Sequence, residues 1–114
     1  MNVYDSARAL AGEMKNSEQY RTYAQAREKA MASSATRAMV DEYHKLQVQA
    51  QAGIMSGKKD EELMRKLQKL GELLQMDRDA SAFLIAEYRL NTMLSDVFKI
   101  LGEAVDIDFG KFAG

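Results

Sequence analysis

Apolar residues recur in steps of three and four along almost the whole of this chain, the spacing that lines one face of an α-helix. Proline is absent, while helix formers such as Ala, Leu, Met, Gln, Glu, Lys and Arg are abundant. The alternating β-branched residues that are typical of strands are nearly absent. The sequence therefore predicts an all-α fold, an antiparallel bundle of about five helices in one domain covering residues 1–114.

The clearest break in this pattern is Ser56–Lys59, where Gly57 suits a helix end and the lysines suit the negative end of a helix dipole. Helices on both sides of the break predict a central helical hairpin. The second of them carries leucines at heptad spacing: Leu63, Leu67, Leu70 and Leu74. Short polar residues able to accept hydrogen bonds from helix amides mark three helix starts: Ser17 for the second helix, Ser33 or Ser34 for the third, and Asp60 for the fourth.

The last predicted helix is the longest, from about Asp79 to Val105, and would span roughly 40 Å at about 1.5 Å per residue. It combines a wide apolar face with a narrow polar one. Because a short chain does not easily cover such a length, we expect a homodimer. A monomeric bundle with the same stripes as its core stays the alternative. Residues 106–114 are expected to form a frayed tail.

Two rows of residues are candidates for a protein interface: Met39, Tyr43 and Leu46 on the third helix, and Leu90, Met93, Val97 and Ile100 on the last. The chain has 8 methionines, and their flexible thioethers suit adaptable apolar surfaces. Gap-filling inside the bundle is the alternative for these methionines. Tyrosines are enriched where two surfaces meet, but they can equally cap the edge of a core.

The charges argue against a strong nucleic-acid binder. Lys and Arg number 16 against 17 for Asp and Glu, so the basic excess that phosphate neutralisation needs is missing. A weak RNA-binding role stays possible through a basic face on the hairpin, formed by Lys58, Lys59, Arg65, Lys66 and Lys69, although acidic residues are interspersed among them.

No set of residues predicts catalysis or a cofactor. Cysteine is absent, which removes thiolate chemistry and cysteine-ligated metal sites. His44 is the only histidine and is expected to be a solvated surface residue. The Gly53–Lys59 segment resembles a phosphate-binding loop but has the wrong glycine spacing and no preceding strand, and Asp106 with Asp108 has no nucleotide fold around it. We therefore predict a protein that is not an enzyme and needs no cofactor, metal or small-molecule substrate.

Membrane insertion is not expected, since no run of about eighteen apolar residues occurs. The amino-terminal Met1–Leu10 segment lacks the basic and apolar regions of a signal peptide. Both features predict a cytoplasmic protein.

The order of breaks and stripes resembles the YlbF/YmcA family of small bacterial competence regulators, which includes the YheA-like proteins. The resemblance covers about Tyr4 to Ile107. It is carried by Ala9 and Leu10 before Lys15–Tyr20, by Leu46 and Gln47 leading to Ser56–Lys58, by Glu61–Leu63 and Leu67–Leu70, and by Leu90, Asn91, Leu94 and Ile100.

This resemblance implies a cytoplasmic all-α adaptor that oligomerises and acts by protein–protein interaction. In the best-known members, the implied role is in an assembly that helps an endoribonuclease process messenger RNAs, with effects on competence, sporulation and biofilm formation. The implied partners are sister family proteins or that endoribonuclease complex. The iron-sulfur clusters of some members are not carried over, because they depend on cysteines. A YheA-like oligomer of unknown role is the alternative.

Overall fold

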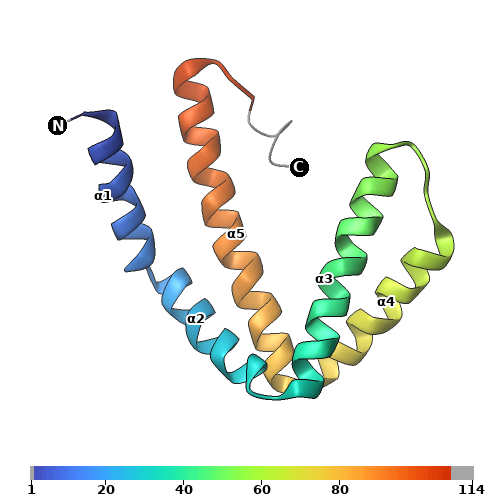
Figure 1. Ribbon diagram of the computed structural model, residues 1–114. Coiled ribbons are helices and arrows are strands. Elements are labelled where there is room, and N and C mark those ends of the chain that lie inside the picture. Colours follow the sequence, from blue (N-terminus) through green and yellow to red (C-terminus); the bar gives the residue numbers. More distant parts are fainter. Residues whose placement is uncertain (1, 109–114) are drawn as a thin grey trace. The chain divides into compact units, whose positions relative to one another are not determined.

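A computed structural model describes residues 2–108 (Figure 1). These residues form five α-helices and no strand, which confirms the all-α prediction. The helices are α1 (Val3–Lys15), α2 (Glu18–Met31), α3 (Ser34–Met55), α4 (Glu61–Met76) and α5 (Arg78–Val105). The boundaries agree with the predicted breaks, except that α5 begins one residue earlier than expected.

Each helix follows directly after a short polar residue whose side chain accepts a hydrogen bond from an amide of the first turn. The oxygen-to-nitrogen distances are 2.9 Å for Asn2 to Asp5, 3.2 Å for Ser17 to Tyr20, 3.2 Å for Ser33 to Thr36, 3.1 Å for Asp60 to Leu63, and 3.1 Å for Asp77 to Ala80. The structure thus selects Ser33 over Ser34 as the cap of α3. The predicted caps Ser17 and Asp60 are confirmed.

The turn between α3 and α4 is a Schellman motif. The amide of Lys58 donates to the carbonyl of Gly53 at 2.8 Å, and the amide of Gly57 donates to that of Ile54 at 3.1 Å. Gly57 has a φ of 79°, a left-handed conformation that favours glycine. A Cβ on Gly53 would lie 2.8 Å from the carbonyl oxygen of Lys58, so the close return of the chain also requires glycine there.

Contacts group the chain into two compact units, one of which is Ala26–Phe83. Within it, α3 and α4 pack against each other as the predicted hairpin. The buried apolar side chains of this unit come from all of its helical segments: Ala30, Val40, Leu46, Ala50, Leu74, Ala80 and Phe83. The unit Ala26–Phe83 therefore has a core of its own, to which α2 and the start of α5 contribute besides the hairpin.

A polar contact joins the start of α3 to the junction between α4 and α5. The hydroxyl of Thr36, which is 5% exposed, donates to a carboxylate oxygen of Asp77 at 2.7 Å. The amides of Asp79 and Ala80 donate to its other oxygen at 3.1 Å each. The Thr36 hydrogen bond, followed by the backbone ones, lowers the pKa of Asp77 below its ordinary value, since all of them favour the charged form.

His44 corrects one prediction. It is half-buried, and its ring lies edge-on to Phe83 with the centroids 6.2 Å apart. The histidine therefore packs at the rim of the core against the buried Phe83 instead of being solvated.

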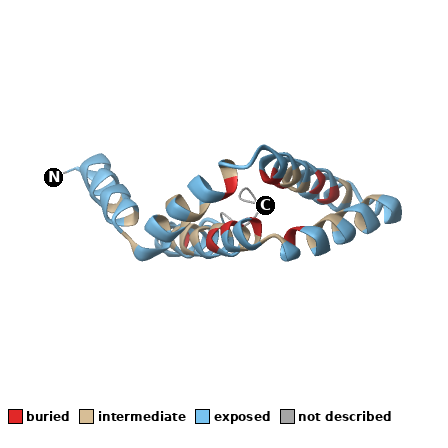
Figure 2. Ribbon diagram, turned by 90° about the horizontal axis from the view of Figure 1, so that it is seen from below, coloured by how far each residue is buried: buried red, intermediate tan, exposed pale blue. Residues whose placement is uncertain are grey.

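The second unit consists of the described residues of Met1–Gln25 and Leu84–Gly114. Within it, α1 has no buried residue, as Figure 2 shows for the helix next to the N mark. At the other end, α5 closes with Asp106 at a φ of 58° and a 2.9 Å hydrogen bond from the amide of Ile107 to the carbonyl of Gly102. The predicted tail is described only to Asp108, and residues 109–114 lie outside the described part of the chain.

Candidate protein-interaction surfaces

The predicted interface residues on α3 lie mainly inside the hairpin. Leu46 is buried, while Met39 and Tyr43 are half-buried. The ring of Tyr43 lies beside Gly71 of α4, where a Cβ would be 3.4 Å from its Cε1 atom. Tyr43 therefore contributes to the contact between α3 and α4, and Met39 and Leu46 lie on the same side of α3, three to four positions from it.

The predicted residues on α5 are more accessible. Leu90, Met93 and Val97 are half-buried, and Ile100 is 66% exposed. Further along, Leu101 and Val105 of the helix are 48% and 58% exposed, and Ile107, just beyond its end, is 48% exposed. Apolar residues at i, i+3, i+4 and i+7 make this face wider than the two-residue seam of a two-stranded coiled coil. We define the apolar residues from Leu90 to Val105 on this side of α5, together with Ile107 beyond its end, as the α5 apolar face.

The charges of this part of α5 lie on its opposite side. Asp96, Lys99 and Glu103 are exposed and follow one another at steps of three and four. No charged residue interrupts the α5 apolar face between Leu90 and Val105. The face is therefore suited to burial against another apolar surface.

The predicted basic face is brought together only in part. Lys58 and Lys59 lie in the turn, whereas Arg65, Lys66 and Lys69 are exposed on α4. Lys66 forms an ion pair of 3.9 Å with Glu62, and Arg65 follows Glu61 by the same four positions. Such pairs at four-residue spacing stabilise the helix and mix the two signs of charge.

The hairpin carries a groove at its turn, with a volume of about 240 Å³. Its apolar lining comes from Ala50 and Ile54 of α3 and from Leu63 and Met64 of α4. Lys58, Lys59 and Asp60 of the turn line its rim. We call it the tip groove. Sequence reasoning missed it, although Gly53 and Gly57, which fold the turn back, were visible signals.

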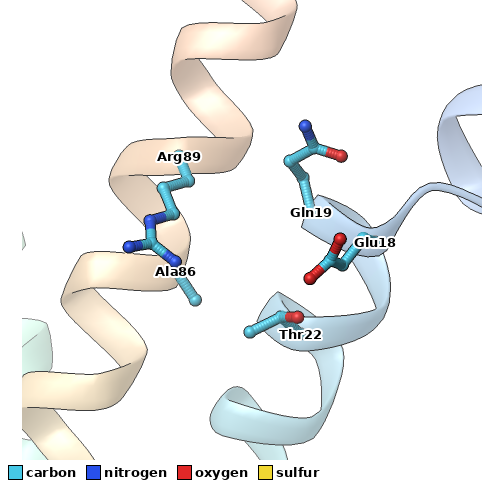
Figure 3. Close-up of a pocket in the computed structure, with 5 residues that line it drawn as sticks. All are labelled: Glu18, Gln19, Thr22, Ala86 and Arg89. Atoms are coloured by element: carbon cyan, nitrogen blue, oxygen red, sulfur yellow. The ribbon is translucent and has the colours of Figure 1, made fainter.

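A second, open pocket of about 180 Å³ lies between α2 and α5 (Figure 3). Glu18, Gln19 and Thr22 line one wall, and Ala86 and Arg89 line the other. Each of these side chains except that of Ala86 is exposed. The pocket holds no nucleophile paired with a base, and nothing in it resembles a catalytic arrangement.

Residues 2–108 contain neither a metal-binding cluster nor a helix that could span a membrane. No cluster of three or more His, Cys, Asp or Glu side chains there is arranged to hold a metal ion. In the same residues, no helix has the length and apolarity that crossing a membrane requires. The Gly53–Lys59 segment is the Schellman turn described above, and Asp106 belongs to the cap of α5.

Comparison with known proteins identifies the family. Residues 3–106 match the family described as control of competence regulator ComK, YlbF/YmcA. The chain belongs to the YlbF/YmcA family. Among its relatives is a UPF0342 protein of Symbiobacterium thermophilum, 42% identical over 93% of this chain and 96% of the relative. A UPF0342 protein of Clostridium novyi is 36% identical over 96% of both chains.

Solved structures show the same fold. A protein of unknown function (DUF964) from Bacillus stearothermophilus has a TM-score of 0.75 at 17% identity, covering 91% of this chain and 92% of that one. Bacillus subtilis RicA, in a crystal structure of its complex with RicF, has a TM-score of 0.59 at 21% identity, covering 91% and 93%. The YlbF/YmcA resemblance read from the sequence is confirmed by the family match, which covers residues 3–106.

Proposed function

We propose that this protein is a non-enzymatic regulatory adaptor, which self-associates through the α5 apolar face and presents the α3–α4 hairpin to a partner. The observation that carries the proposal is the exposure of Ile100, Leu101 and Val105 on α5 and of Ile107 just beyond its end. Contiguous exposed apolar surface of this kind is typical of protein–protein interaction sites. Membership of a family of competence regulators supports a regulatory role.

The size of this face fits self-association. Burying the exposed half of one of these four side chains contributes about 1 kcal/mol. The four side chains on each of two copies therefore contribute about 8 kcal/mol before the cost of association is subtracted. Association itself costs about 4–15 kcal/mol, so the half-buried row Leu90, Met93 and Val97 must contribute as well. A homodimer that uses the whole face from Leu90 to Ile107 satisfies this requirement.

The proposed partners are sister proteins of the YlbF/YmcA family or an endoribonuclease complex in the cytoplasm. Through them the adaptor would modulate messenger RNA processing, and so competence, sporulation and biofilm formation. Support comes from the family match and from the structure of RicA in complex with RicF, which is a complex of a protein with this fold.

Light scattering on the purified chain tests self-association. We expect the wild type to have the mass of a dimer at micromolar concentration, and Ile100→Glu to have that of a monomer, because a buried unpaired carboxylate is costly. Ser95→Glu is the control, since Ser95 is exposed and lies about 140° around the helix from Ile100. A monomeric wild type would contradict the proposal.

The partner is tested by capturing the tagged protein from extract of its own host, with and without ribonuclease. We expect a sister family protein or an endoribonuclease to be recovered in both samples. Recovery that ribonuclease abolishes would show that RNA holds the partners together, and recovery of the chain alone would refute the adaptor role.

A further inference from the structure

The tip groove has the form of a site for one large apolar side chain. Ala50 is buried, Leu63 and Met64 are half-buried, and Ile54 is 63% exposed at the edge. Methionine adapts its shape readily to what it contacts. A groove with an apolar floor and an exposed aliphatic edge can accept apolar side chains of different shapes, and their burial there would be favourable.

The charge at the rim of the tip groove is positive. Lys58 and Lys59 are both exposed, and the Gly53 hydrogen bond holds Lys58 beside the groove. The last ten residues of α3, 46–55, contain no charged residue. The cations of the turn are therefore not neutralised from the α3 side.

The nearby acidic residues cancel this charge only in part. Asp60, whose carboxylate accepts the amide of Leu63 at 3.1 Å as the cap of α4, also lines the groove and offsets one of the two cations. Glu61 and Glu62 of the first turn of α4 are not among the residues that line the groove. Glu62 pairs with Lys66.

We infer that the tip groove docks a partner protein through an amphipathic helical segment with an acidic flank, one apolar side chain of which enters the groove. This inference rests on the proposed adaptor function and names the chemistry of its partner. An apolar anchor surrounded by opposite charge is a recurrent mode of helix recognition. RNA fits less well, because its phosphates need a basic track, whereas Arg65 and Lys66 of α4 follow acidic residues by four positions.

Fluorescence anisotropy with the full chain tests this inference. The probes are two labelled helical peptides of about 14 residues with the same leucine stripe, one flanked by glutamates and one by lysines. We expect the glutamate peptide to bind at least about tenfold more tightly. The double variant K58E/K59E should lose that preference, whereas K66E/K69E, with the same change of net charge on the outer side of α4, should keep it.

A second pair of variants tests the apolar part of the site. Ile54→Ser should weaken binding of the glutamate peptide by about tenfold, because it removes the exposed edge of the groove. Val48→Ser is the control, since Val48 is 69% exposed on the same helix and does not line the groove. Circular dichroism verifies that each variant is folded.

Three results would overturn the inference. The peptides could bind equally or not at all; a single-stranded RNA could bind in a way that K58E/K59E abolishes while the glutamate peptide does not; or Ile54→Ser could convert a dimer to a monomer, which would make a second copy the occupant. The light-scattering comparison of Ile100→Glu with the wild type is independent of all three, so failure at the tip groove is distinguishable from failure of the adaptor proposal.

Discussion

Replacing Leu74 by alanine is expected to remove a large share of the stability of the α3–α4 hairpin. Leu74 is 0% exposed and is one of the largest fully buried side chains in the described residues. Truncating a buried leucine costs about 2–5 kcal/mol, from lost transfer energy and the cavity left behind. Since a domain of this size is stable by about 5–15 kcal/mol, the variant should unfold about 12 °C lower if the loss is about 3 kcal/mol.

The matched control for this prediction is Leu73→Ala. Leu73 precedes Leu74 on the same helix but is 50% exposed, so the same chemical change should cost about 1 kcal/mol or less. Helix propensity changes equally in both variants and cancels from the comparison. Urea unfolding followed by circular dichroism measures both. An equal loss for the two variants would refute the assignment of α4's inner face to α3.

Two further predictions concern the turn and the polar contact. Gly57→Ala should lower the free energy of unfolding by about 1–2 kcal/mol, because Gly57 has a φ of 79°, whereas Gly12→Ala in the exposed interior of α1 should raise it by about 0.5–1 kcal/mol; thermal unfolding measures both. Because the pKa of Asp77 is lowered in the folded chain, its charged form stabilises the protein above the ordinary value of 3.8 and this contribution is lost as pH falls through the folded value. Asp77→Asn should therefore be less stable than the wild type at pH 7, and the difference should shrink as the pH falls below 3.8; a difference that stays the same would argue against the ionic contribution.

Local chemistry was enough to place the helices. A serine, asparagine or aspartate can satisfy the free amides of a helix start without help from distant residues, so Ser17 and Asp60 could be recognised as caps from the sequence. The choice between Ser33 and Ser34 was different. Both could accept the amide, and the buried position of Thr36 against Asp77 fixes the first turn of α3 so that Ser33 caps it.

The candidate surfaces were predicted less completely, because exposure depends on what lies opposite. Met39, Tyr43 and Leu46 share the helical spacing of Val97 and Ile100, yet the first group faces α4 while Ile100 is left exposed. The periodicity of a helix reports that a face is apolar but not which neighbour covers it.

The sequence by itself determined the helical class, the breaks between helices and the family, because these depend on spacing and on contacts between residues a few positions apart. Only the tertiary structure decided that His44 packs against Phe83, that Thr36 reaches Asp77 across 41 positions, and that Ile54 and Met64 from different helices share one groove with Lys58. Such contacts join residues far apart along the chain, and their geometry follows from how α3 and α4 meet at a turn that only glycine at positions 53 and 57 allows.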